Sequence, residues 1–140
     1  MAINFILHET FLNVGERKRL KSYIESLFIR KEKKLSLLTY IFCSDQYLLS
    51  INREFLNHDD FTDIITFCLS EPTQPIIGEI YISADRIREN AQNLGVSTRH
   101  ELHRVIFHGA LHLCGYKDKR PRDKARMTQE EDKNLALYFG

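Results

Sequence analysis

The feature that most constrains the fold is the segment from Thr98 to Cys114, because its apolar residues occur on nearly every side of a helix. They are Leu102, Val105, Ile106, Phe107, Ala110, Leu111 and Leu113. A helix that is hydrophobic all round has to be covered on most of its surface. We therefore expect residues 99–114 to form a buried central helix. Thr98 and Glu101 have the spacing of a capping box, which predicts where that helix begins.

Two histidines lie four residues apart in this segment, so His108 and His112 share one face of the predicted helix. Gly115 permits a left-handed backbone that can end the helix, and Asp118 is the next side chain able to bind a metal. The spacing His-x3-His-x2-Gly-x2-Asp therefore predicts that these three side chains bind one metal ion and form the catalytic centre. Three ligands leave one tetrahedral position open, as in catalytic zinc sites. The alternative is that both histidines are ordinary core residues.

Metzincin proteases also place two histidines at this spacing, but there a glutamate follows the first histidine and acts as the general base. Gly109 occupies that position in this chain. The spacing alone therefore leaves a zinc metalloprotease open as an alternative, and the residue at position 109 counts against it.

The rest of the chain alternates between two kinds of hydrophobic pattern. Apolar residues at helical spacing predict helices over residues 16–31, 45–56, 84–94 and 122–138. In the second and third of these helices, the residues expected to point inward are Leu48, Ile51 and Phe55, and Ile87, Ala91 and Leu94. Short segments rich in β-branched and aromatic residues predict strands over residues 3–8, 35–43, 62–70 and 76–83.

The predicted order of elements is βαβαββααα, with at least one antiparallel pair between residues 62 and 83. The fold class that we expect is mixed α/β, with a small mixed sheet packed against about five helices around the central one. The chain has 140 residues, of which 43% are hydrophobic and 28% charged, and this predicts a single domain over residues 1–140.

Composition also bears on where the protein works. No apolar run approaches the roughly 20 residues that a membrane span needs, so we expect no membrane association. The first residues lack the pattern of a secretory signal. Cys43, Cys68 and Cys114 form no Cys-x-x-Cys pair, which favours free thiols in a reducing cytoplasm.

Positive charge is concentrated in two segments, although the net charge is only +1. Eight of the 20 Lys and Arg residues lie between Arg17 and Lys34, and six more lie between Lys117 and Arg126. A basic segment directly after a hydrolytic metal motif suits a phosphate backbone better than a peptide. The alternative is a solvated helix face, which we favour for the first segment.

Two blocks of sequence carry a resemblance to a known family. The first is Ile51-Asn-Arg-Glu-Phe55 followed by Thr62-Asp-Ile-Ile-Thr-Phe67 and Gly78-Glu-Ile80, and the second runs from His108 to Asp118. The first is similar to the Leu-Asn-x-x-Tyr-Arg, Thr-Asp-Val-Leu-Ser-Phe and Gly-Asp-Ile elements of the YbeY family of rRNA maturation factors. The second is similar to that family's His-Gly-x-Leu-His-Leu-x-Gly-Tyr-Asp-His motif.

The resemblance implies a metal-dependent, single-strand endoribonuclease that acts on an rRNA precursor, together with the small ribosomal subunit or its assembly factors, in the cytoplasm. It implies one Zn²⁺ or another divalent transition metal per chain. The residues we expect to contact RNA are Arg104, Lys117, Lys119, Arg120 and Arg122. Asp63 and Glu79 are candidate partners of the histidines, or simply residues at strand ends. A ribosome-assembly factor that binds RNA with weak or no nuclease activity is the alternative.

Two departures from the family motifs concern the metal ligands and the scissile phosphate. The third metal histidine of the family corresponds to Asp118, whose carboxylate oxygen also binds zinc but shifts the preference toward harder metals. The arginine that follows the aromatic residue of the first block corresponds to Leu56. If that arginine contacts the scissile phosphate, Lys117, Lys119 or Arg104 has to supply the charge here.

Overall fold

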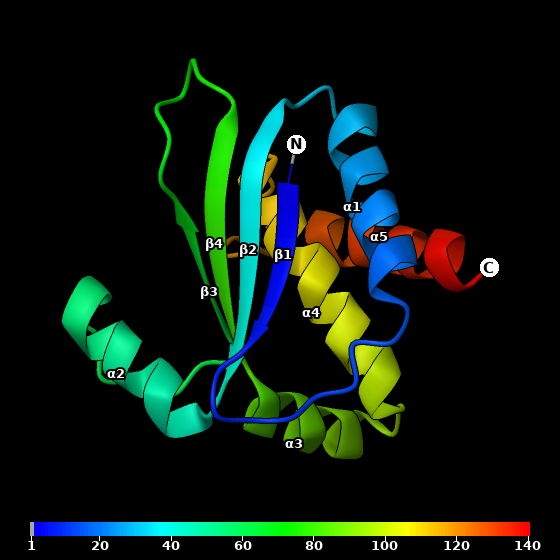
Figure 1. Cartoon of the computed structure of the whole chain (residues 1–140). Helices are drawn as coiled ribbons and strands as arrows, with labels where there is room; N and C mark the ends of the chain where they lie inside the picture. Colours follow the sequence, from blue (N-terminus) through cyan, green and yellow to red (C-terminus); the bar gives the residue numbers. More distant parts are fainter. Residues whose placement is uncertain (1) are drawn as a thin grey trace.

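The computed structural model describes residues 2–140 as a four-stranded sheet with five helices (Figure 1). The strands are β1 (Ala2–Leu7), β2 (Leu35–Cys43), β3 (Ile64–Cys68) and β4 (Ile76–Ser83). The helices are α1 (Arg17–Arg30), α2 (Asp45–Leu56), α3 (Ala84–Leu94), α4 (Thr98–Leu113) and α5 (Pro121–Phe139). This order is the predicted βαβαββααα, and the mixed α/β class is confirmed.

The sheet has the strand order β1-β2-β4-β3. The pairs β1–β2 and β2–β4 are parallel, whereas β3 runs antiparallel to β4 with Phe67 opposite Glu79. The predicted antiparallel pair between residues 62 and 83 is therefore confirmed. Because β3 is an edge strand, the loop that leads into it from α2 lies at the border of the sheet.

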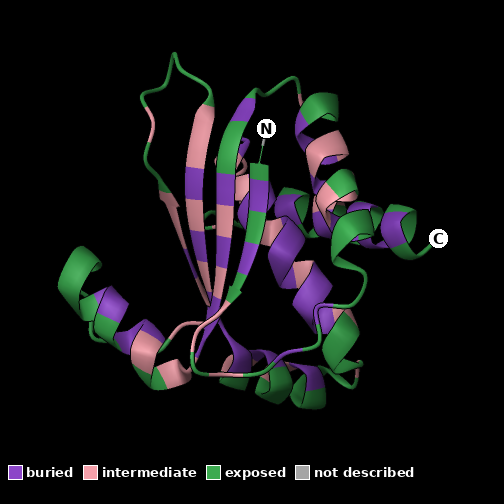
Figure 2. Cartoon of the chain, in the orientation of Figure 1, coloured by how far each residue is buried: buried purple, intermediate pink, exposed green. Residues whose placement is uncertain are grey.

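The helix α4 lies at the centre of the molecule, behind the sheet in Figure 1, and contacts α1, α3, α5, β3 and β4. Buried residues follow one another along it, as Figure 2 shows. Leu102, Val105, Ile106, Phe107, Ala110 and Leu111 are each almost completely buried and belong to one core with the sheet, α1 and α5. The prediction of a buried central helix is confirmed. Of the helices in residues 2–140, none is long and apolar enough to span a lipid bilayer.

Two glycines allow α4 to lie directly on the sheet. A Cβ atom at Gly109 would lie 2.8 Å from Cδ1 of Ile80 and 3.1 Å from Cδ1 of Ile64. A Cβ atom at Gly78 of β4 would lie 2.6 Å from Cδ1 of Leu113. Position 109, which holds the general base of metzincins, therefore faces the sheet in this fold and has no space for a glutamate.

The start of α4 differs from the prediction by one residue. Ser97 is the N-cap, and its Oγ accepts a hydrogen bond from the backbone nitrogen of His100 at 3.0 Å. The predicted capping box of Thr98 and Glu101 is therefore wrong. Ser97 and Thr98 are both good N-cap residues, so the sequence alone does not decide between them. Glu101 does not cap the helix, because its buried carboxylate accepts hydrogen bonds from Arg104.

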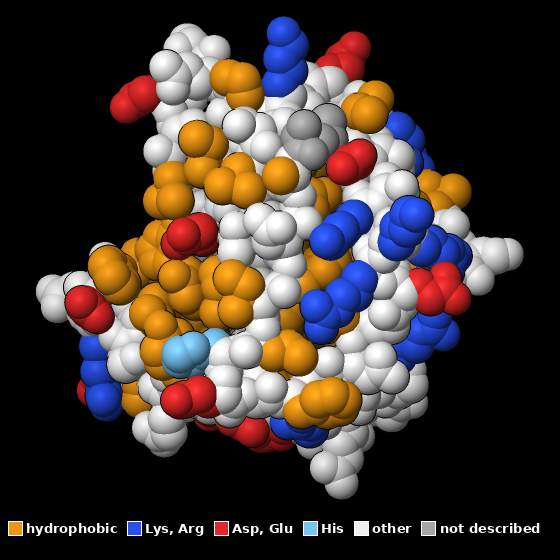
Figure 3. Space-filling view, in the orientation of Figure 1, with side chains coloured by type: hydrophobic (Ala, Val, Ile, Leu, Met, Phe, Trp, Pro, Cys, Tyr) orange, Lys and Arg blue, Asp and Glu red, His pale blue; other side chains and the backbone are white. Residues whose placement is uncertain are grey.

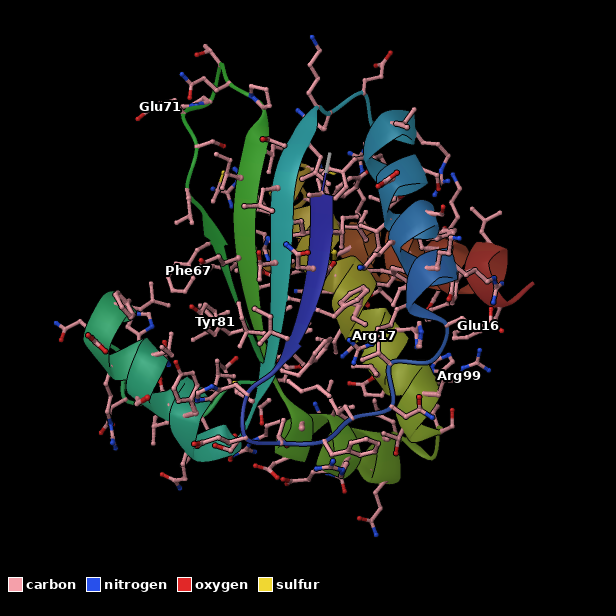
Figure 4. The ribbon with its side chains drawn as sticks, viewed as in Figure 1. Glu16, Arg17, Phe67, Glu71, Tyr81 and Arg99 are labelled. Carbon is pink, nitrogen blue, oxygen red and sulfur yellow. The ribbon has the colours of Figure 1, made fainter. Side chains whose placement is uncertain are left out.

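The second face of the sheet is only partly covered, because α2 projects away from it (Figure 1). Apolar side chains are visible over this face in Figure 3, and Phe67 and Tyr81 lie on it in Figure 4, with their ring centroids 5.8 Å apart. Phe55 is 61% exposed and Leu94 is 62% exposed, so the predictions that they point inward are wrong. Leu94 is the last residue of α3, and Phe55 makes only an edge-on contact with the ring of Phe67, with the two centroids 6.1 Å apart.

We predict that Gly109→Ala destabilises the protein by about 1–2 kcal/mol, although alanine is the better helix former by about 1 kcal/mol. The cause is overpacking against Ile80, which typically costs about 1–3 kcal/mol. Urea denaturation would measure this change. Ile80→Val removes the Cδ1 atom that the new methyl group meets, so the double variant should be more stable than the sum of the two single effects predicts. Strictly additive effects would contradict the proposed close contact.

Candidate metal centre

The turn after α4 brings Asp118 next to the two histidines. Gly115 has a φ of 103°, a left-handed value that favours glycine, as predicted. The backbone nitrogen of Tyr116 donates to the carbonyl of Leu111 at 3.0 Å, which folds the chain back over the last turn of α4. As a result, a side chain six residues after His112 lies beside both imidazoles.

The three side chains converge through one nitrogen or oxygen atom each. Oδ2 of Asp118 lies 3.2 Å from Nε2 of His108 and 3.3 Å from Nε2 of His112. Donor atoms bound to one tetrahedral zinc at ordinary bond lengths are about 3.3 Å apart. One ligand atom from each of His108, His112 and Asp118 lies within 4.8 Å of the others, and all three residues are half-buried. The donor set and its spacing therefore fit one divalent transition metal ion.

Glu131 of α5 determines which nitrogen of His108 is available. Its Oε2 lies 2.5 Å from Nδ1 of His108, and its side chain is only 5% exposed. A carboxylate can only accept, so Nδ1 carries the proton and Nε2 keeps its lone pair toward Asp118. Carboxylates commonly hold metal-binding histidines in this way. No motif in the sequence indicates this role for Glu131; the available signal is its place on the buried side of α5 with Met127 and Leu135.

Arg104 is enclosed by carboxylates. It donates two hydrogen bonds to Glu101, at 2.7 and 2.8 Å, and one to Oε1 of Glu131 at 3.1 Å, and its guanidinium lies 3.9 Å from Asp63. The hydrogen bonds to Glu101 raise the pKa of Arg104, although burial opposes this. Burial likewise raises the pKa of Asp63, although Arg104 opposes this. The positive charge of Arg104 is therefore compensated by the carboxylates around it.

A cleft with a volume of about 900 Å³ opens in front of the three donor residues. One wall is the loop 57–63, which buried Asn52 holds by donating to the carbonyl of Asp60 at 2.8 Å. The charged residues that line the cleft are Arg104, Lys119, Lys124, Asp60, Asp63 and Asp118. Three cations and three carboxylates thus line the cleft, so its walls have no excess of positive charge of their own.

The predicted RNA-binding residues are divided between two surfaces. Arg104 and Lys119 line the cleft, whereas Lys117 and Arg120 line a separate hollow on the other side of their loop. Arg122 is exposed on the first turn of α5. Leu56 lies in the cleft wall and is 40% exposed, so an arginine at this position could reach a bound phosphate.

The two candidate partners of the histidines have different positions. Asp63 lies in the cleft wall beside Arg104. Glu79 points away from α4, because its neighbours Gly78 and Ile80 face that helix and side chains alternate along a strand. The carboxylate of Glu79 instead accepts a hydrogen bond from the hydroxyl of Tyr81 at 3.2 Å. Cys114 also lies away from the cleft, and burial raises its pKa to about 11.

We predict that Glu131→Gln lowers the affinity for zinc about 10- to 100-fold, the usual range for partners of metal-binding histidines. The amide no longer neutralises Arg104 and holds the imidazole less firmly. Competition with a chromogenic chelator would measure the affinity. Glu130→Gln is the matched control, because Glu130 precedes Glu131 on α5 but binds Lys31. Equal zinc affinity in wild type and Glu131→Gln would refute the role of this carboxylate.

The sequence of the chain was compared with those of known protein families and proteins. The sequence profile described as Endoribonuclease YbeY matches residues 8–138. The protein named Endoribonuclease YbeY from Cytophaga hutchinsonii is 44% identical over 135 residues, which cover 96% of this chain and 94% of that protein. Its namesake from Flavobacterium psychrophilum is 42% identical over 131 residues, covering 94% and 93% of the two chains.

A solved structure has a similar fold. The solution structure of TM1509 from Thermotoga maritima matches with a TM-score of 0.66 and 26% sequence identity, covering all of this chain and 90% of that chain. The family profile and the two relatives each span most of the sequence, including the segment with both histidines and Asp118. The chain therefore belongs to the YbeY endoribonuclease family.

Proposed function

We propose that this chain is a metal-dependent endoribonuclease that cleaves RNA phosphodiester bonds in the cleft beside His108, His112 and Asp118. The observation that carries the proposal is the convergence of Nε2, Nε2 and Oδ2 at the spacing of tetrahedral ligands. Membership of the family supports the reaction class. We assign the activity to residues 1–140 acting as one domain.

In this proposal, His108, His112 and Asp118 hold a single Zn²⁺ or another divalent transition metal. When bound, such an ion supplies Lewis acidity at a phosphoryl oxygen and lowers the pKa of a water toward neutrality. Glu131 keeps the proton of His108 on Nδ1 and thereby keeps Nε2 free for the metal. Lys119 and Lys124, both exposed and both in the cleft wall, bind the non-bridging oxygens of the phosphate.

Two further groups of the cleft complete the proposed mechanism. Asp63 lies in the same wall beside Arg104, where its carboxylate can take up a proton during the reaction. The nucleophile is a water molecule or the 2′-hydroxyl of the RNA. These two reactions leave different ends on the products, so end-group analysis of the fragments distinguishes them.

We further propose that the substrate is an rRNA precursor and that the partners are the small ribosomal subunit or its assembly factors. The family's assignment to rRNA maturation supports this choice. A cytoplasmic location is supported by Cys43, Cys68 and Cys114, which are free cysteines.

One observation favours a second candidate function, that of an RNA-binding assembly factor with weak nuclease activity. Leu56 replaces the arginine of the family motif in the cleft wall, and Arg104 is engaged by carboxylates. A metalloprotease is disfavoured, because position 109 faces the sheet. Fluorescent RNA and casein, each incubated with the protein with and without chelator, separate the three functions.

We predict that the protein as isolated contains one divalent transition metal per chain, most of it zinc, and that His108→Ala/His112→Ala loses it. Asp118→His should retain the metal, because imidazole nitrogen replaces carboxylate oxygen at a similar bond length. Elemental analysis measures the metal content, and chelator should abolish RNA cleavage. The same metal content in wild type and in the double variant would rule out this ligand set.

We predict that Lys119 supplies the positive charge that Leu56 lacks, so that Lys119→Ala lowers RNA cleavage about 10²-fold or more, as removal of a transition-state donor commonly does. Leu56→Arg alone should then change little, whereas Leu56→Arg in the Lys119→Ala background should restore cleavage with little change in affinity. Single-turnover cleavage rates measure both effects.

The matched control for this rescue is Phe55→Arg, which adds the same charge at the neighbouring exposed residue. It should not restore the Lys119→Ala variant, because Phe55 lies outside the cleft lining. If wild type and Leu56→Arg both fail to cleave RNA with any divalent metal, the nuclease proposal fails and the assembly-factor function is favoured.

A further inference from the structure

A second hollow, with a volume of about 540 Å³, lies on the other side of the loop that carries Asp118. Its lining comes from the end of α1, from the loop after α4 and from the first turns of α5. The residues are Lys31, Cys114, Gly115, Tyr116, Lys117, Arg120, Asp123 and Arg126. Between these loop residues, Asp118 and Lys119 line the metal cleft instead. The loop is therefore a ridge with the metal cleft on one side and this basic hollow on the other.

The basic hollow is more positive than the metal cleft. Lys31, Lys117, Arg120 and Arg126 line it, against a single carboxylate from Asp123. Glu130 forms an ion pair with Lys31 at 2.6 Å, so an excess of two positive charges remains. Lys117, Arg120 and Arg126 are exposed, and their side chains are free to bind a ligand from solvent. Counted in the same way, the metal cleft has no positive excess, because its three cations are opposed by three carboxylates of the lining and by the two carboxylates that bind Arg104.

The chemistry of the basic hollow suits a phosphate rather than a nucleobase. Tyr116 is its aromatic side chain, and its hydroxyl accepts a hydrogen bond from Lys31 Nζ at 2.8 Å. Lys31 and Arg126 also lie against the ring, 5.0 and 5.7 Å from its centroid. A ring that is engaged by two cations is a poor platform for base stacking. The groups left to a ligand are N–H donors, which bind phosphate oxygens without regard to sequence.

The basic hollow also joins the two positive segments of the sequence. Lys31 belongs to the first segment and is held at the ridge by Tyr116 and Glu130. Burial lowers the pKa of Lys31, but the hydrogen bonds to Glu130 and Tyr116 outweigh this and raise it, so the ammonium stays charged. The second segment supplies Lys117, Arg120 and Arg126. The segment from Arg17 to Lys34 was interpreted as a solvated helix face. This interpretation does not hold for Lys31, the C-cap of α1, because its ammonium binds Tyr116 and Glu130.

We propose that the basic hollow binds a backbone phosphate of the same RNA strand whose scissile phosphate lies in the metal cleft, with the strand crossing the ridge at Asp118 and Lys119. This inference rests on the proposed ribonuclease function and adds a second contact that lies outside the reacting centre. A single RNA strand is the occupant that satisfies both surfaces, because the two hollows share one loop as their common wall.

The test compares two double variants with the same change in composition. Lys117→Ala/Arg120→Ala removes two cations from the basic hollow, and Arg17→Ala/Lys18→Ala removes two exposed cations from the opposite end of α1, where Figure 4 labels Arg17. Arg120 forms no side-chain hydrogen bond as the N-cap of α5, so its replacement removes no cap. Both variants should keep the thermal midpoint and the zinc affinity of wild type, which shows that the loop still presents Asp118.

The main measurement is the affinity of the zinc-loaded protein for a fluorescent single-stranded RNA of about 20 nucleotides, whose 2′-O-methyl phosphorothioate linkages prevent cleavage. We expect the variant of the basic hollow to bind at least fivefold more weakly at about 100 mM salt, with a salt slope smaller by about one for the lost phosphate contact. The Arg17→Ala/Lys18→Ala variant should bind like wild type. Equal affinity and slope in the two double variants would overturn the proposal.

Two further measurements separate this inference from the proposed nuclease activity. The long RNA, when it is not saturating, should be cleaved more slowly by the variant of the basic hollow than by wild type, and a trinucleotide that fills only the metal cleft should show a smaller loss. If wild type cleaves neither RNA, the nuclease function fails, while the affinity measurement still tests the hollow. If Lys117→Ala/Arg120→Ala loses binding of inorganic phosphate in calorimetry but not of RNA, the hollow takes a free anion and the proposal is wrong.

Discussion

The candidate site depends on one buried carboxylate. Glu131 binds Arg104 through Oε1 and His108 through Oε2, and it joins α5 to α4 in doing so. Removing one partner of such a buried ionic group leaves an uncompensated charge and typically costs about 3–5 kcal/mol. The contact that orients the metal-binding nitrogen is therefore also a contact that holds two core helices together. In this fold, the geometry of the site and the packing of α5 cannot vary independently.

Balanced charge in the cleft makes its attraction for RNA conditional. Asp60, Asp63 and Asp118 offset the cations of the walls, and Arg104 is held by the buried carboxylates behind them. A divalent ion held by His108, His112 and Asp118 would make the local potential positive, so that a phosphate would be attracted to the three donor residues. The basic hollow beyond the ridge is positive without a metal. In the proposed mechanism, residues of the basic hollow bind the RNA strand, whereas the metal held by His108, His112 and Asp118 activates the scissile phosphate.

What could be predicted from the sequence was local in the chain. The i, i+4 spacing of His108 and His112 and the turn at Gly115 determine the donor set within a few residues, and the hydrophobic periodicity gave the order of all nine elements. Glu131 could not be predicted as the partner of His108, because it lies 23 residues away and its role depends on how α5 crosses α4. The division of residues 115–120 between two hollows likewise depends on the path of a loop in space.

Three departures from the family motifs, at positions 56, 117 and 118, change the charge near the site. Relative to that motif, Asp118 replaces a histidine and Leu56 replaces an arginine, and each change makes the metal cleft less positive by one charge. The residue before Asp118 is Lys117, where the motif has an aspartate, and this change adds two positive charges on the other side of the ridge. The changes at these three positions sum to zero, with less positive charge at the metal cleft and more at the basic hollow than the motif gives. Long-range attraction of a polyanion depends on the total, whereas stabilisation of a transition state depends on charge within a few ångströms of the phosphate. Under the proposed function, these three changes together leave the long-range attraction for RNA unaltered, and the role proposed for Lys119 and Lys124 is to supply positive charge inside the cleft.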